Sequence, residues 1–175
     1  TYFPIFLLGA IFGKVMDKSG AAKCIANTIA SKLGKEKAII AVVLSCAILT
    51  YGGVSLFVVA FAVYPIAVSL FREAQIPKRF IPASIALGSF TFTMSALPGT
   101  PQIQNAIPMP FFNTDAYAAP IIGIVGSAIM LFGGLFWLTY RSKKAMAKGE
   151  GYGNHNENFS KLDQSKLPSF ITSII

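Results

Sequence analysis

Long apolar stretches alternate with short polar ones along the chain, and this pattern predicts membrane helices. Residues 38–71 carry no charged side chain, and residues 80–140 carry only Asp115. Apolar runs of this length are typical of helices that lie in lipid rather than of a soluble core. We therefore expect an all-α integral membrane protein.

Two helices are expected ahead of these runs. Residues 2–15 are apolar and predict the tail of a membrane helix whose start is missing from the chain. In residues 17–37, apolar positions recur at helical spacing among basic ones. This spacing predicts an amphipathic helix at the membrane interface, with its cationic face toward the lipid headgroups.

A helical hairpin is predicted next. Residues 38–50 rise only about 20 Å as a helix, which is too short to cross a hydrocarbon core of about 30 Å. Tyr51-Gly52-Gly53 then interrupts the run, and residues 54–71 resume it. Either the two arms form a re-entrant hairpin whose tip lies near mid-membrane, or they are two crossings joined by a very short turn.

The basic clusters favour the re-entrant hairpin. They lie within residues 14–37, 72–79 and 141–148, and the positive-inside tendency places all three on the cytoplasmic side. A hairpin returns to the side on which it started and so satisfies the first two clusters. Two full crossings satisfy them as well, but the first arm is too short for a crossing.

The second interrupted segment is predicted to be a discontinuous transmembrane helix. Residues 81–96 lead to Pro98-Gly99-Thr100-Pro101, where two prolines and a glycine cannot continue a helix. We expect residues 103–112 to continue outward, residues 113–115 to form an external polar turn, and residues 116–140 to cross back. Broken backbone at membrane depth is tolerated only where it lines a cavity in the protein, which is how many transporters build a substrate site.

Composition supports the membrane interpretation and excludes other classes. Hydrophobic residues make up 54% of the chain and charged residues 13%, against about 25% charged residues in a soluble domain. The net charge of +8 could indicate nucleic acid, but the basic residues flank apolar segments, so we expect lipid and no nucleic-acid partner. Paired carboxylates, metal-ligand clusters and nucleophile–base pairs are not evident, so we expect no enzyme, no catalytic residue and no metal site.

The two interruptions predict a binding site for a small organic anion. The second hairpin arm begins near Gly53, so its free N–H groups point inward, and Thr100 can cap a helix that starts at Pro101. Two converging helix N-termini hold an anion without a buried cation, and the apolar segments contain no Lys or Arg. The predicted substrate-binding residues are Thr50, Gly52, Gly53, Ser55, Ser95, Gly99, Thr100, Gln102, Gln104 and Asn105.

Five stretches resemble the gluconate permease (GntP) family: Leu8–Met16, Ser19–Ala22, Leu49–Val54, Pro98–Asn105 and Ala118–Pro120. The resemblance implies a multi-pass symporter of the bacterial inner membrane that moves gluconate or a related sugar or hydroxy acid with protons, without a cofactor. It also implies the wider ion-transporter superfamily, whose two inverted repeats each contain a re-entrant hairpin and a broken helix, and whose members are often homodimers.

This resemblance predicts how the chain is divided. Residues 1–142 would be the first transporter repeat with its start missing, residues 143–167 a cytoplasmic linker, and residues 168–175 the truncated start of the second repeat. Two alternatives stay open at this point. One is a sodium-coupled di- or tricarboxylate carrier of the same superfamily, and the other is a channel or a non-transporting membrane scaffold.

Overall fold

The computed structural model describes residues 3–94, 97–100 and 102–154, and every regular element that these residues form is helical. The all-α prediction is therefore confirmed for this part of the chain. In order, the elements are α1 (Phe3–Lys18), α2 (Ala21–Leu33), the 3₁₀ turn η1 (Lys35–Lys37), α3 (Ala38–Tyr51), α4 (Leu56–Glu73), α5 (Phe80–Met94), α6 (Ile103–Ala106), α7 (Met109–Phe112) and α8 (Pro120–Ala147).

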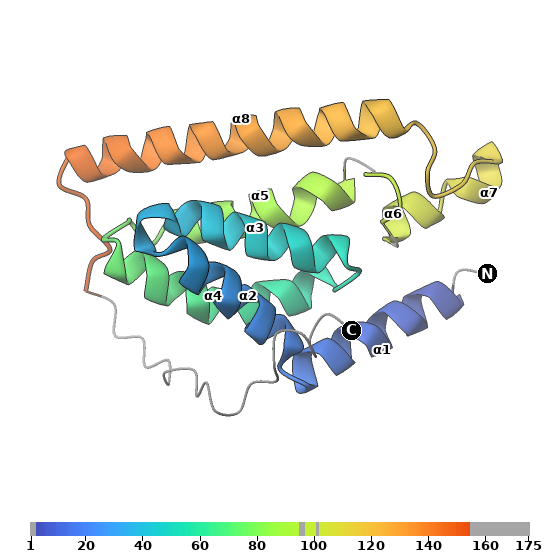
Figure 1. The fold of residues 1–175 in the computed structure, drawn as a ribbon, viewed down its shortest axis with the longest axis horizontal. Coiled ribbons are helices and arrows are strands. Elements are labelled where there is room, and N and C mark those ends of the chain that lie inside the picture. Colours follow the sequence, from blue (N-terminus) through green and yellow to red (C-terminus); the bar gives the residue numbers. More distant parts are fainter. Residues whose placement is uncertain (1–2, 95–96, 101, 155–175) are drawn as a thin grey trace.

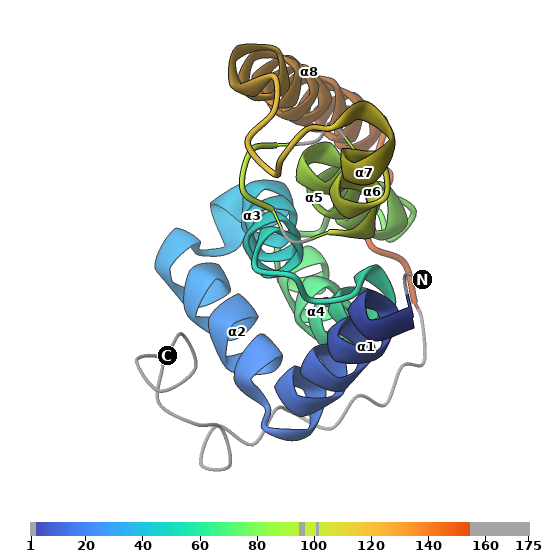
Figure 2. The ribbon, with the colours of Figure 1, turned by 90° about the vertical axis from the view of Figure 1, so that its right-hand side faces the viewer.

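The core is a bundle formed by α2, α3, α4 and α5 (Figure 1). Helix α8 runs along α5 on one side of this bundle, and α1 contacts α2 and α4 on the other side (Figure 2). Short α6 and α7 lie beyond the end of α5 (Figure 1). The largest fully buried apolar side chains are Phe71, Leu49, Ile81, Val42, Val43, Val54, Val59 and Val63.

Helix α2 forms where the periodic pattern predicted a helix, and the structure shows what covers its apolar face. Ala22, Ile25 and Ala26 on its apolar face are buried, and the helix packs against α3 and α4. The apolar face is therefore covered by α3 and α4, and the placement of the cationic face at the lipid headgroups stays a prediction. Amphipathic spacing reports only that one face is apolar and does not report what covers it.

The predicted hairpin of two apolar helices corresponds to α3 and α4, which pack against each other. The Gly53 N–H donates to the Thr50 carbonyl (3.0 Å) and the Val54 N–H to the Leu49 carbonyl (3.1 Å). This pair of bonds, with φ +92° at Gly53, is a Schellman motif that ends α3. The second arm begins at Leu56, later than predicted, because the amides of Gly53 and Val54 complete α3.

The segment after the second interruption is shorter and more broken than predicted. In place of one outward run over residues 103–112, there are two four-residue helices, α6 and α7, separated by Ile107 and Pro108. Proline lacks an N–H and disfavours helical backbone at the preceding residue, so Pro108 ends α6. The polar turn after α7 is present, and Asn113 adopts a left-handed conformation with φ +50°.

Helix α8 is the longest element and exposes most of its surface. It begins at Pro120 and extends to Ala147, so the first residues of the predicted linker, from Lys143, are helical instead. Among the described residues, α4 and α8 are long and apolar enough to cross a membrane. The exposed large side chains of α8 are Ile121, Ile122, Ile124, Val125, Ile129, Met130, Phe132, Phe136, Trp137, Tyr140 and Met146.

The chain beyond α8 folds back onto the bundle. The Tyr152 side chain is 3% exposed and belongs to the hydrophobic core, and the Arg72 guanidinium lies 5.5 Å from its ring centroid. Glu150 forms a 2.5 Å ion pair with Arg79. These contacts attach part of the predicted linker to the end of α4 and to the loop between α4 and α5. The remainder of that linker and the predicted second repeat lie outside the described residues.

Glycine allows α3 and α5 to pack closely. A Cβ atom added at Gly88 on α5 would lie 2.3 Å from the Val43 carbonyl oxygen and 2.7 Å from the Cys46 Cβ on α3. Gly134 similarly brings α8 against Leu87 of α5. Small residues at helix contacts are the usual route to close packing in membrane proteins. The close packing of α3 and α5 brings their ends, where the two interruptions begin, to the same side of the bundle.

Replacing Gly88 by Ala should therefore destabilise the protein by about 1–3 kcal/mol, because the added methyl group overpacks this contact. Gly133→Ala is the matched control, since Gly133 lies in α8 and its added Cβ meets no atom within 4 Å. The control should leave stability unchanged or slightly higher. Thermal unfolding of the purified full-length protein in detergent measures both variants, and an equal midpoint for the two would contradict the packing described for Gly88.

Candidate functional site

The structure brings the two interrupted segments into direct contact. The Tyr51 hydroxyl at the end of α3 donates a hydrogen bond to the Pro98 carbonyl (3.1 Å). The Gln102 side-chain amide donates to the Thr50 carbonyl (2.6 Å). Residues about fifty positions apart in the sequence thus meet at one end of the bundle, and we take this junction as the candidate site.

Two polar groups at the junction are buried without a hydrogen-bond partner in the described part of the chain. They are the hydroxyl of Thr100, whose side chain is 1% exposed, and the side-chain oxygen of Asn105. The Asn105 amide nitrogen lies 3.4 Å from the carbonyls of Leu97 and Thr100, which orients this side chain. Buried polar atoms are nearly always hydrogen-bonded, so these two atoms mark a place where a polar guest can bind.

The positive end of α4 lies beside the hairpin turn. The first backbone bond of this helix runs from the Val59 N–H to the Ser55 carbonyl (3.0 Å), so the amides of residues 56–58 have no partner within the helix. The Ser55 hydroxyl forms no capping bond. The free amides are thus those at the start of α4, and not those near Gly53 as predicted. An 18-residue helix carries a positive N-terminal charge that favours an anion.

The predicted cap at the second interruption is wrong. Helix α6 starts at Ile103, and the Gln102 carbonyl accepts hydrogen bonds from the Asn105 and Ala106 N–H groups. The Thr100 hydroxyl caps nothing, and Pro101 lies outside the described residues. Because α6 has only four residues, it contributes little dipole. In the part of the chain that the structure describes, the two interruptions therefore do not present two long helix N-termini, and the helix that supplies a strong positive end is α4.

The remaining residues of the predicted substrate-binding set do not all lie at the junction. The Thr50 hydroxyl donates back to the Cys46 carbonyl (2.8 Å), so Thr50 offers its backbone rather than its side chain to the junction. Gly52 and Gln104 are exposed, and Ser95 lies outside the described residues. Gly99 is part of the junction, where its N–H donates to the Ala116 carbonyl (2.9 Å).

Two tyrosines at the junction were missed in the sequence. Besides Tyr51, the ring of Tyr117 lies against Gly99, where a Cβ atom would be 3.2 Å from the ring. The Asp115 side chain accepts a hydrogen bond from the backbone N–H of Tyr117 (2.8 Å), which constrains the backbone that carries this ring. Residues just after the predicted external turn therefore cover the interruption. A tyrosine next to a helix break, with its apolar ring and polar tip, was the available signal for Tyr51.

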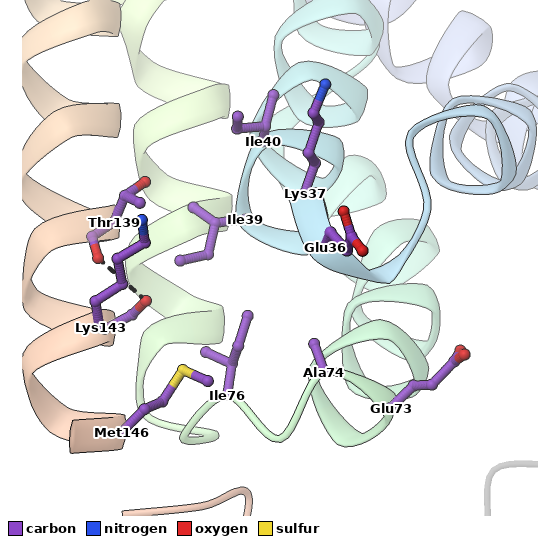
Figure 3. Close-up of a pocket in the computed structure, with 11 residues that line it drawn as sticks. Glu36, Lys37, Ile39, Ile40, Glu73, Ala74, Ile76, Thr139, Lys143 and Met146 are labelled. Carbon is purple, nitrogen blue, oxygen red and sulfur yellow. Dashed lines mark hydrogen bonds between the residues drawn. The ribbon is translucent and has the colours of Figure 1, made fainter. Parts of the chain in front are cut away.

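A separate pocket of about 360 Å³ lies at the opposite, basic end of the bundle (Figure 3). It is formed by the start of α3, the end of α4 and the last turns of α8, and none of the predicted binding residues line it. Glu36 and Lys37 border it together with Ile39 and Ile76 (Figure 3). Neighbouring opposite charges give this pocket no clear preference for an anion, so the junction is the better candidate.

Comparisons with known proteins give a consistent assignment. The model of the GntP family permease matches residues 3–175. The uncharacterized transporter YxjC of Bacillus subtilis (strain 168) is 59% identical over 164 residues, which cover 94% of this chain and 35% of that protein. An uncharacterized transporter of Haemophilus influenzae (strain ATCC 51907 / DSM 11121 / KW20 / Rd) is 31% identical over 172 residues, which cover 97% of this chain and 38% of that protein. The chain thus spans little more than a third of these relatives, and no solved structure matches it.

Replacing Thr100 by Val should leave the stability of the solute-free protein unchanged or higher, because the change removes a buried hydroxyl that has no partner. Thr50→Val is the control, since the Thr50 hydroxyl is hydrogen-bonded and its loss should cost up to about 1 kcal/mol. Both are measured by thermal unfolding of the full-length protein in detergent. A larger loss for Thr100→Val than for Thr50→Val would show that the Thr100 hydroxyl has a partner in the fold.

Proposed function

Because the chain belongs to the GntP permease family, we propose that it is part of a secondary active transporter for a small organic anion in the bacterial inner membrane. The observation that supports this most is the junction, where two interrupted apolar segments meet and bury unpartnered groups of Thr100 and Asn105. The family and the names of the two relatives point to a transporter rather than an enzyme.

The proposed substrate is gluconate or a related sugar or hydroxy acid. A carboxylate only accepts hydrogen bonds, so it suits the free amides and positive end of α4. The unpartnered Asn105 oxygen also only accepts, so it requires a donor such as a substrate hydroxyl. A hydroxy acid carries both kinds of group, whereas a plain carboxylate leaves the Asn105 oxygen without a partner.

We propose that uptake of the substrate is coupled to the uptake of protons. Residues 38–71 and 80–112 contain no acidic side chain, so this part of the protein supplies no buried carboxylate relay. The proton would travel with the substrate or bind to the remainder of the carrier. Sodium coupling is the alternative, and the transport experiment below distinguishes it from proton coupling.

A homodimer, as the family resemblance implies, is proposed as the assembly.

The proposed topology is a re-entrant hairpin, α3–α4, facing a discontinuous transmembrane helix that begins with α5. Helices α3 and α5 have 14 and 15 residues and rise about 21 Å from their basic ends. Their far ends therefore lie inside a hydrocarbon core of about 30 Å. Residues 1–142 would form the first of two inverted repeats and residues 143–167 the linker to a second repeat that starts at residue 168. Of the two hairpin helices, α4 is long enough to cross a membrane and α3 is not.

Replacing Asn105 by Ala in the full-length protein should reduce uptake of labelled gluconate at least tenfold while membrane insertion persists, because the substrate loses an acceptor at the site. Asn27→Ala is the matched control, since Asn27 is an amide residue on α2. Uptake into proteoliposomes is measured with an imposed pH gradient and, separately, a sodium gradient. Normal uptake by Asn105→Ala would remove this residue from the site, and stimulation by sodium alone would replace proton coupling with sodium coupling.

Cysteine accessibility tests the topology. Asn113 is exposed in the turn after α7, and Gly52 is exposed at the hairpin tip. A bulky membrane-impermeant thiol reagent added outside intact cells should modify Asn113→Cys but not Gly52→Cys, because a re-entrant tip remains within the membrane. Glu73→Cys at the end of α4 should also be protected, since it lies on the cytoplasmic side. Rapid external modification of Gly52→Cys would instead indicate two full crossings.

A further inference from the structure

We propose that Tyr51 and Gln102 are positioning residues that fasten the hairpin tip to the second interruption, and that Gln102 acts in this way rather than by contacting the substrate. The inference rests on the proposed function, because the site that these residues position is the transport site. Its two supporting contacts are the hydrogen bonds from Tyr51 to Pro98 and from Gln102 to Thr50.

The Gln102 side chain is held in place by the protein. Its nitrogen donates to the Thr50 carbonyl at 2.6 Å, and the same carbonyl accepts the Gly53 N–H of the Schellman motif at 3.0 Å. Gln102 therefore binds the last turn of α3 at the point where that helix ends. This bond uses one of the two N–H donors of the side-chain amide and holds the side chain against the end of α3, which is the role that we assign to it.

The Tyr51 hydroxyl satisfies a carbonyl that the interruption leaves exposed. In a continuous helix, the Pro98 carbonyl would accept the N–H of residue 102, but the chain is not helical at residues 97–100. Tyr51 supplies a replacement donor at 3.1 Å. Lipid cannot satisfy a carbonyl group, so this bond both stabilises the interruption and fixes its position relative to α3.

The two bonds run in opposite directions and enclose Thr100. Tyr51 donates to Pro98 before Thr100, and Gln102 after Thr100 donates to Thr50. The backbone on both sides of Thr100 is thereby attached to consecutive residues at the end of α3. The Thr100 hydroxyl and the Asn105 oxygen stay buried without a partner. These two groups are left to contact the substrate, and the attachment holds them in place.

Substrate analogues separate positioning from contact. Uptake of gluconate and of its monodeoxy analogues is measured in proteoliposomes for Tyr51→Phe, Gln102→Ala and Asn105→Ala. The first two variants should raise KM for every analogue by the same factor, about three- to tenfold, as expected for one lost hydrogen bond that acts through the protein. Asn105→Ala should change KM by a factor that depends on which hydroxyl is missing. A KM factor for Gln102→Ala that varies among the analogues would overturn the proposal.

A second readout does not require transport. In a full-length background without its native cysteines, Thr100→Cys should react slowly with a thiol reagent, because position 100 is 1% exposed. Adding Tyr51→Phe or Gln102→Ala should accelerate this reaction at least threefold, whereas the control Tyr140→Phe, on the exposed face of α8, should not. Equal rates in all four proteins would overturn the positioning role even if gluconate is transported. Accelerated labelling without any anion transport would support the attachment and reject the proposed function.

Discussion

Backbone hydrogen bonding in an apolar environment is the constraint on which this structure depends. Each interruption of a membrane helix releases N–H and C=O groups that lipid cannot satisfy. At residues 51–54, the Schellman motif satisfies two N–H groups of the chain itself. At the second interruption, the Pro98 carbonyl accepts its hydrogen bond from a distant donor, the Tyr51 hydroxyl. The hairpin tip and the second interruption therefore stabilise each other, and the proposed site lies where they are in contact.

Close helix packing aligns the two interruptions. Gly88 allows α5 to approach the Val43–Cys46 turn of α3, and both helices start beside basic residues and have nearly equal lengths. Their far ends consequently lie at the same level, where the side chains of Tyr51 and Gln102 can reach across. Helix α8 packs along α5, and the residues ahead of it close over Gly99. The site is thus positioned by rigid helices and closed by a short loop.

The sequence was sufficient where local chemistry decides the structure. Gly52 and Gly53 end α3, and Pro98 and Gly99 lie in a non-helical stretch, as the local preferences of proline and glycine predict.

The other features depend on tertiary packing, which the sequence pattern does not report. The sequence pattern of an apolar helix face is the same whether protein or lipid covers that face, so the burial of α2 was not predictable. Pro108 splits the run that was expected to continue from Ile103 to Phe112, and the start of α6 at Ile103 removed the capping role expected of Thr100. The bonds of Tyr51 and Gln102 join distant segments and leave no periodic signal.

The proposed transport mechanism requires a negatively charged, hydroxylated guest at the junction of the two interruptions. A structure of the full-length protein determined by electron cryo-microscopy with gluconate bound would test this most directly. We expect ligand density within hydrogen-bonding distance of the Thr100 hydroxyl and the Asn105 side-chain oxygen, with the Tyr51–Pro98 and Gln102–Thr50 contacts intact. Ligand density elsewhere in the protein, or a structure in which the two interruptions are separated, would contradict the proposal.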